Sequence, residues 1–171
     1  MKKPVMTAFL LASSALAQTS GTGAAPMTGM AMPPTIKADS AKKTVQVTFV
    51  AGHGTTNNGL NYNGDAKGEK TLTVPLGWTV EVTLNNTGRM PHDFAVIAGS
   101  TLPANPFTAR LAFPNAATTV VPPAGSTAAP AKFIANRPGT YFILCRVGKH
   151  AQNGMYVKMQ VVNGAKAVTY Q

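Results

Sequence analysis

Residues 78–85 constrain the fold of this chain most strongly, because apolar and polar side chains alternate there without a break. A period of two places every second side chain on the same face of a β-strand, so that one face is buried and the other solvated. The turn-forming residues 85–88 then end the strand. We therefore expect a sheet with one buried face and Trp78 in the core. The apolar members are Trp78, Val80, Val82 and Leu84.

The rest of the chain favours an all-β fold. Between residues 44 and 163, short strand patterns recur between turn signals, and no helical periodicity is sustained. We therefore predict one domain over residues 44–163, a Greek-key β-sandwich. The proline-rich residues 99–130 are predicted to form a covering or functional loop with a short helix at 107–113, and Tyr141 a tyrosine corner. The other predicted strands are residues 45–49, 60–62, 71–74, 94–97, 131–135, 140–145 and 155–162.

The N-terminal residues have the pattern of an export signal. Lys2 and Lys3 precede an apolar stretch at 5–16, and Ala15-Leu16-Ala17 has the form of a cleavage site. The stretch is short for a membrane-spanning helix, although an uncleaved anchor stays an alternative. We therefore predict a signal peptide at 1–17 and an exported protein at the periplasmic or extracellular face of the cell membrane.

Two further segments are predicted to lie outside the sandwich. Residues 18–43 are rich in Thr, Ser, Gly, Ala and Pro, which is typical of a flexible, low-complexity tether. This tether carries Met27, Met30 and Met32, whose thioethers could bind Cu(I). Residues 164–171 are predicted to be a loose C-terminal tail.

The charge and cysteine content narrow the partners and the chemistry. The formal net charge is +10, yet no basic cluster or set of stacking aromatic residues accompanies it, which argues against a nucleic-acid partner. We expect instead a partner protein with an acidic docking surface. The single cysteine, Cys145, excludes an intramolecular disulfide. Metal ligation would explain why an exported protein keeps one oxidisable thiol.

Cys145 begins a run of three candidate metal ligands. His150 follows five residues later and Met155 five residues after that, on a glycine-containing loop between two predicted strands. A thiolate, an imidazole and a thioether form a soft donor set that suits copper. Taken singly, these residues are more often a buried cysteine, a solvated histidine and a core methionine.

His92 supplies the fourth candidate ligand, because it follows Pro91 at the start of a predicted strand. Two imidazoles, a thiolate and a weak axial thioether make the blue-copper arrangement. A structural zinc site would instead need four strong ligands. We expect His92 to be the more buried imidazole and His150 to lie nearer solvent. His53, in a Gly-rich loop, is expected to be solvated, with replacement of His92 as the alternative.

These motifs resemble those of the cupredoxins. The spacing Cys145-x4-His150-x4-Met155 is similar to their ligand loop, in particular that of the sulfocyanin and rusticyanin group. The segments that resemble sulfocyanin are Gly59-Leu60-Asn61-Tyr62-Asn63-Gly64, Val74-Pro75-x-Gly77-Trp78-x-Val80 and Asn85-Asn86…Pro91-His92. The resemblance covers residues 44–163. It implies a single-domain cupredoxin that carries electrons on one type 1 copper ion, for which His92, Cys145, His150 and Met155 are the candidate ligands. We also expect the protein to be a monomer.

The resemblance leaves two functions open. The first is electron transfer between exported or membrane-bound redox partners. The alternative is a copper chaperone or storage protein that uses the same site and the methionine-containing tether. An enzyme is not expected, because a copper enzyme needs an open coordination position or further histidines, and this chain has three histidines and no His-x-His pair.

Two departures from the family pattern bear on the site. Asp93 follows His92 where relatives usually carry Ser or Asn. We hypothesise that Asp93 accepts a hydrogen bond from a backbone N–H near Cys145 and makes the reduction potential pH-dependent, with a solvated loop aspartate as the alternative. The second departure is basic: Arg146 and Lys149, with Arg89, are expected to form a cationic rim around His150 that favours an acidic redox partner.

Overall fold

A computed structural model describes residues 31–123 and 125–171 of the chain. The predicted signal peptide and residues 18–30 of the predicted tether lie outside the described residues. Within the described part, no helix has the length and apolar character needed to cross a membrane.

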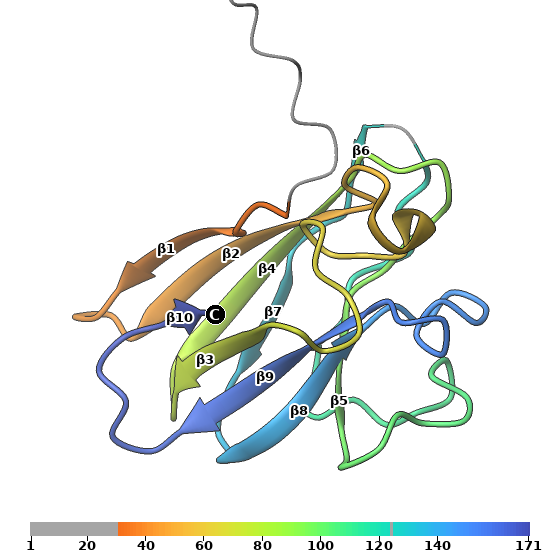
Figure 1. The fold of residues 1–171 in the computed structure, drawn as a ribbon. Helices are drawn as coiled ribbons and strands as arrows, with labels where there is room; N and C mark the ends of the chain where they lie inside the picture. The colour runs from red at the N-terminus through yellow and green to blue at the C-terminus, as the bar shows by residue number, and fades with distance from the viewer. Residues whose placement is uncertain (1–30, 124) are drawn as a thin grey trace, which may run out of the picture.

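The described residues form two five-stranded sheets, each with parallel and antiparallel pairs, which pack as the layers of a β-sandwich (Figure 1). The predicted all-β sandwich is confirmed. The first sheet has the order β1-β2-β4-β6, with β7 also paired to β4; its strands are β1 (Thr35–Asp39), β2 (Thr44–Ala51), β4 (Thr79–Asn86), β6 (Ser126–Thr127) and β7 (Ala131–Ile134). The second has the order β10-β3-β9-β8-β5; its strands are β10 (Thr169–Tyr170), β3 (Thr71–Pro75), β9 (Tyr156–Val162), β8 (Gly139–Leu144) and β5 (Ala95–Ala98).

The alternating segment that led to this prediction is β4, a central strand. Burial alternates along it residue by residue, with Val80, Val82 and Leu84 fully buried and Trp78 just before it 6% exposed. Its neighbour β2 runs parallel to it and alternates in the same way, so that Val45 pairs with Val80. Both strands therefore present one apolar face to the core between the sheets, as the period of two predicts.

Tyr141 on β8 is a tyrosine corner, as predicted. Its ring is buried, and its hydroxyl donates a hydrogen bond of 2.8 Å to the carbonyl of Arg137, four residues upstream. The contact fixes the turn that leads into β8, the strand that ends beside Cys145.

The sandwich extends beyond the predicted limits at both ends. β1 pairs antiparallel with β2, so the predicted tether boundary at residue 43 is wrong. β10 pairs with β3, and the ring of Tyr170 packs edge-on against Phe49 at 6.0 Å between centroids, so the predicted loose tail is wrong as well. Neither strand could be recognised from an alternating pattern of apolar residues, because β1 is largely exposed and β10 has only two residues.

Two smaller elements also differ from expectation. Residues 60–62 form no strand; Tyr62 makes isolated bridges that follow a short 3-10 helix, η1 (Thr56–Gly59). Residues 107–113 form turns and not a helix. Ala112 and Phe113 are buried in the core, whereas Phe107 is 71% exposed. The buried side chains therefore do not recur with the spacing of an amphipathic helix.

The long connection 99–130 is a covering segment, as predicted. Two of its residues form isolated β-bridges with the outer edge of β5, in the pairs Leu111–Ile97 and Ala117–Ala95. A third bridge joins Val121 to His92, one of the candidate ligands. It therefore protects an edge strand and forms one wall of the site described next.

Candidate metal centre

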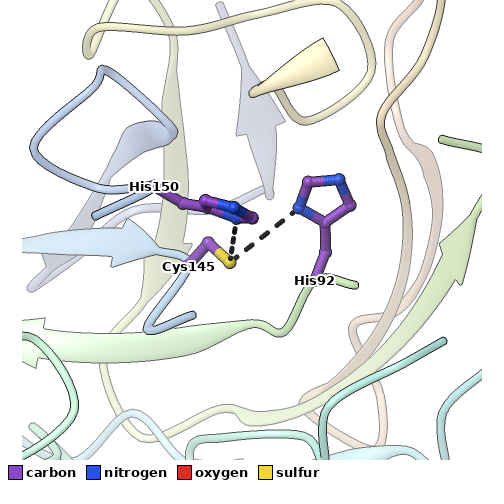
Figure 2. Close-up of side chains that lie close together, drawn as sticks. All are labelled: His92, Cys145 and His150. Atoms are coloured by element: carbon purple, nitrogen blue, oxygen red, sulfur yellow. Dashed lines mark hydrogen bonds between the residues drawn. The ribbon is translucent and has the colours of Figure 1, made fainter. Parts of the chain in front are cut away.

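His92, Cys145 and His150 converge at one end of the sandwich (Figure 2). Their candidate ligand atoms all lie within 4.8 Å of one another. The sulfur of Cys145 lies 4.0 Å from Nδ1 of His92 and 3.5 Å from Nδ1 of His150. His92 and Cys145 are fully buried and His150 is half-buried, so the expected order of exposure of the two imidazoles is confirmed.

Strand geometry brings the histidine and the cysteine together. Antiparallel β5 and β8 pair Ala95 with Leu144, so the residues before β5 meet the residues after β8. His92 precedes β5, and Cys145 follows β8 directly. Two ligands that are distant in sequence therefore lie side by side because of the strand register.

The loop between β8 and β9 is closed by its own backbone. The N–H of Cys145 donates to the carbonyl of Met155 at 3.2 Å, and the N–H of Met155 donates to the carbonyl of His150 at 2.9 Å. Gly154 has a φ of +97°, and a Cβ there would lie 2.8 Å from Cγ of Lys67. Glycine suits this position because φ is positive and the chain turns against a neighbouring side chain.

Asn86 fixes the segment that carries His92. Its side-chain amide donates to the carbonyls of Met90 at 2.8 Å, Val121 at 3.1 Å and Pro122 at 2.9 Å. His92 in turn exchanges two backbone hydrogen bonds with Val121, of 3.1 and 2.7 Å. The sequence predicts a turn at Asn86 and does not indicate its role in fixing the segment of His92. That role becomes clear only from its full burial, because a buried amide must find hydrogen-bond partners.

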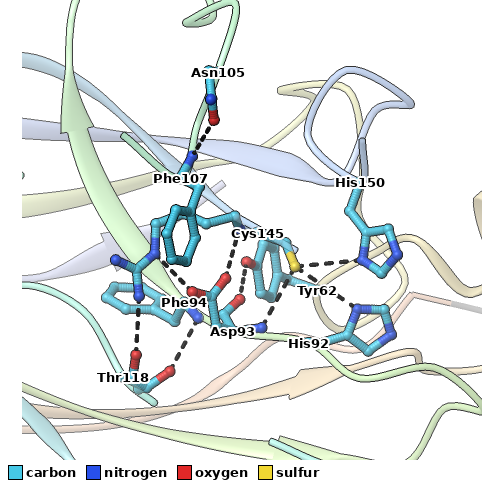
Figure 3. A network of polar contacts seen from close by, with 10 residues as sticks. Tyr62, His92, Asp93, Phe94, Asn105, Phe107, Thr118, Cys145 and His150 are labelled. Atoms are coloured by element: carbon cyan, nitrogen blue, oxygen red, sulfur yellow. Dashed lines mark hydrogen bonds and ion pairs between the residues drawn. The ribbon is translucent and has the colours of Figure 1, made fainter. Parts of the chain in front are cut away.

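Asp93 is 1% exposed and joins the two halves of the site (Figure 3). One carboxylate oxygen accepts the backbone N–H of Arg146 at 2.6 Å, and the other accepts Nε–H of the same residue at 2.7 Å. The N–H of Asp93 donates to the sulfur of Cys145 at 3.4 Å. The hypothesised bond to a backbone N–H near Cys145 is confirmed, and the solvated alternative is wrong.

Arg146 corrects the expected cationic rim. Its guanidinium points inward to Asp93 and to the carbonyl of Thr118 at 3.2 Å, so its charge is neutralised and its side chain is 19% exposed. The buried carboxylate overrides the preference of an arginine for solvent. Arg89 and Lys149 are exposed and remain as cations on neighbouring segments.

The protonation states suit metal binding. Burial, and then the nearby His150, lowers the pKa of His92 to about 4, and burial also lowers the pKa of His150. Burial, and then the charge of Asp93, raises the pKa of Cys145 to about 12 against the opposing hydrogen bonds from backbone N–H groups. At neutral pH the metal-free site thus holds two neutral imidazoles and a thiol, which would release its proton to solvent when a metal binds.

The spacing of the donors fits a metal ion between them. Typical bond lengths of about 2.1 Å to nitrogen and about 2.3 Å to sulfur, at angles near 115°, give sulfur–nitrogen separations of roughly 3.7 Å. The observed 4.0 and 3.5 Å lie on either side of that value. Nδ1 of both rings faces the sulfur, while Nε2 of His92 is buried with no hydrogen-bond partner among the described residues.

The other predicted site residues fall into two groups. Met155 ends the same loop and is fully buried. His53 is hydrogen-bonded through its backbone to the side chain of Asn61 and lies outside the donor cluster that the described residues form. The structure thus assembles the cluster with His92 and not with His53.

Comparisons with known proteins agree with this geometry. Residues 32–113 match the sulfocyanin (SoxE) domain family model. Sulfocyanin of Sulfolobus acidocaldarius is 28% identical over 136 residues, which is 75% of this chain and 68% of that protein. The structure of auracyanin B is similar with a TM-score of 0.53, 19% identity and coverage of 76% of this chain and 96% of that one. Auracyanin A, a "blue" copper protein from Chloroflexus aurantiacus, is similar with a TM-score of 0.50 and 20% identity. That match covers 70% of this chain and 99% of auracyanin A.

A two-sheet sandwich with a buried His–Cys–His cluster at one end gives this chain a cupredoxin-like fold, as in auracyanin B. In sequence, the chain is similar to sulfocyanin. The family match spans His92 and Asp93 but ends before Cys145. The grouping of Cys145 and His150 with His92 therefore rests on the structure.

Proposed function

We propose that this chain is a mononuclear type 1 copper protein that transfers electrons. The copper would be held by His92, Cys145 and His150, with Met155 as the weak axial ligand. The observation that supports this most directly is the convergence of two Nδ1 atoms on one buried sulfur, at 4.0 and 3.5 Å. Bound copper supplies a one-electron change between Cu(II) and Cu(I).

The residues of the chain hold the donors still and keep water away. His92 and Cys145 are fully buried, and the backbone on either side of them is hydrogen-bonded to Val121 and Met155. The N–H of Asp93 stabilises negative charge on the sulfur. A site fixed in this way reorganises little when its charge changes, which is what a carrier requires. His150, the most exposed of the three converging residues, would be the route from the cluster to a partner.

Electron transfer is favoured over copper delivery and over catalysis. A chaperone must release its metal, whereas His92, Cys145 and Met155 are fully buried here and Asn86 holds the segment of His92 in place. Met27 and Met30 of the predicted tether lie outside the described residues, and Met32 is 40% exposed with its N–H bonded to the carbonyl of Asn63. Catalysis would need an open position for substrate, and the proposed four ligands leave none.

The redox partner of this proposal is a protein with an acidic surface, which docks at the end of the sandwich that carries His150. The chain has 15 basic and five acidic residues, and two of the acidic ones, Asp65 and Asp93, are buried. Electron transfer with such a partner should slow as salt increases. We further propose that the chain is exported, directed by residues 1–17, and that it works as a monomer.

Visible and EPR spectra of the Cu(II) form test the proposal. We expect an intense thiolate-to-copper absorption that Cys145→Ser abolishes, a reversible electrode response, and copper that resists a mild chelator. A colourless, zinc-loaded protein after exposure to copper would overturn the proposal. Rapid loss of copper to the chelator would favour the chaperone or storage function.

A further inference from the structure

The segment Leu60-Asn61-Tyr62-Asn63-Gly64 is a rigid turn for which the proposed site gives no role. The side-chain oxygen of Asn61 accepts the N–H groups of His53 at 3.1 Å and Gly64 at 2.9 Å. Its amide donates to the carbonyls of His53 at 3.1 Å and Thr56 at 2.7 Å. One fully buried side chain thus makes four hydrogen bonds, which is more than a surface turn needs.

The turn holds the side chain of Tyr62 in the core. Tyr62 is fully buried, its backbone exchanges hydrogen bonds with Asp65 at 3.0 and 2.8 Å, and its ring packs edge-on against Phe49 at 5.8 Å. Its hydroxyl donates a hydrogen bond of 2.6 Å to the backbone carbonyl of Asp93 (Figure 3). Burial raises the pKa of Tyr62 well above its usual value, so the hydroxyl keeps its proton and donates it.

Asp93 is held at three points, and one of them is the sulfur of the cluster. Its carbonyl accepts from Tyr62, its carboxylate accepts from Arg146, and its N–H donates to Cys145. The N–H and the carbonyl of one residue are separated by two backbone torsions. Fixing the carbonyl from one side and the carboxylate from the other therefore fixes where the N–H points.

We propose that Tyr62 is a positioning residue for the copper-binding thiolate and acts on it through Asp93. Tyr62 does not touch the sulfur; it aims the Asp93 N–H at the sulfur. This inference rests on the proposed copper site for its electronic consequence, although the hydrogen-bond geometry stands without the metal. Hydrogen bonding around the cysteine sulfur tunes the potential of a blue-copper site, so the contact of Tyr62 with Asp93 should affect the potential.

Tyr62→Phe removes the hydroxyl and keeps the ring. The Asp93 carbonyl then loses its donor, and the N–H bond to the sulfur lengthens or becomes less linear. A thiolate that receives a weaker hydrogen bond donates more charge to copper and stabilises Cu(II) over Cu(I). We therefore expect a lower reduction potential and a shifted thiolate-to-copper absorption in Tyr62→Phe.

Tyr141→Phe is the matched control. It also removes a hydroxyl that donates to a backbone carbonyl, that of Arg137 at 2.8 Å. Tyr141 lies near the start of β8, whereas Cys145 follows the end of that strand. Both variants should lower the urea midpoint of unfolding, but only Tyr62→Phe should move the potential and the absorption. Equal potentials and spectra for Tyr62→Phe and the wild type would overturn the proposal.

Amide hydrogen exchange of the metal-free chain gives a readout that needs no copper. The Asp93 amide should exchange about tenfold faster in Tyr62→Phe, the equivalent of one lost hydrogen bond, and at the wild-type rate in Tyr141→Phe. An unchanged Asp93 rate would overturn the positioning role. A wild-type protein without a blue band but with faster Asp93 exchange in the variant would overturn the copper function and leave the positioning role standing.

Discussion

Asp93 and Arg146 are a cross-strand pair that continues the β5–β8 ladder beyond its last paired residues. The register pairs Ala95 with Leu144, and two further steps set Asp93 opposite Arg146, where Nε and Oδ2 lie 2.7 Å apart. Each member directly follows a candidate ligand, His92 or Cys145. The ion pair therefore ties together the backbones of the two ligands that come from different strands, whether or not a metal is bound.

Removing either charge should be costly. Arg146→Gln leaves the buried Asp93 carboxylate without its ion-pair partner, which costs about 3 kcal/mol or more of the free energy of unfolding. Asp93→Asn leaves the partly exposed Arg146 unpaired and should cost less. The double variant should lose less than the sum of the two. Urea unfolding of the metal-free protein measures all three. The exposed pair Lys42–Asp39, with N–O at 3.3 Å, is the control, and Lys42→Gln should cost about 0.5 kcal/mol or less. Additive effects at Asp93 and Arg146 would contradict the coupling.

The metal-free protein should lose stability in acid because of His92. Its folded pKa is about 4, against about 6.5 for a free imidazole. The unfolded chain therefore takes up a proton that the folded chain refuses, so stability is full above about pH 6.5 and falls as the pH approaches 4, by up to about 3 kcal/mol. Urea midpoints between pH 7 and 4 measure this fall. His92→Gln should make the fall shallower without abolishing it, because the lowered pKa of His150 and the raised pKa of Asp65 remain in both proteins. An equally steep fall in the variant would contradict the assignment.

Gly52→Ala should destabilise the loop above His92. Gly52 has a φ of +68°, and a Cβ there would lie 2.5 Å from the Cα of Gly88 and 3.4 Å from Nε2 of His92. Left-handed backbone strain and overpacking together should cost roughly 2–5 kcal/mol. Gly77→Ala is the control, because Gly77 has a φ of +83° with no atom within 4 Å of the added Cβ; about 1–2 kcal/mol is expected there. Equal losses in thermal unfolding would show that the close approach of the two glycines is unimportant.

Met155→Leu tests the proposed axial ligand. The exchange conserves volume, so stability should fall by less than about 1.5 kcal/mol. Loss of a thioether donor removes electron density that stabilises Cu(II), so the potential should rise while the intense absorption remains. Voltammetry of the copper protein measures the potential. Met159→Leu, at another fully buried methionine on β9, should leave it unchanged. A potential that does not move in Met155→Leu would exclude methionine ligation.

The strands and the donors could be predicted because each rests on local chemistry. Burial in β4 alternates with a period of two, and the same alternation of polar and apolar residues is visible in the sequence of residues 79–86. Cys145 and His150 belong to the few residue types that bind soft metals, and their spacing of five already places them on one loop. His92 was identified because it begins a strand, and the strand register then brings it to the cysteine.

What could not be predicted depends on burial and on long-range pairing. The sequence predicts Arg146 to be a surface cation, but its guanidinium pairs with the buried carboxylate of Asp93. Thr118 lies in a proline-rich connection with no pattern, yet its hydroxyl accepts the N–H of Phe94 and its carbonyl accepts from Arg146. β10 is a strand because it pairs with β3, and the hydroxyl of Tyr170 also donates to the carboxylate of Asp65, 105 positions earlier in the chain. No local rule indicates such partners.

The parallel pairs in both sheets have a kinetic consequence. Thr71 on β3 pairs with Lys158 on β9, so this ladder joins segments that are far apart in the chain. Contacts between residues so far apart pay loop-closure entropy before they stabilise anything, and folds dominated by them mature in milliseconds to seconds. β9 also follows the loop of Cys145 and His150. We therefore expect Cys145 to become buried only when β9 pairs, so that its thiol is most open to oxidation while the chain folds.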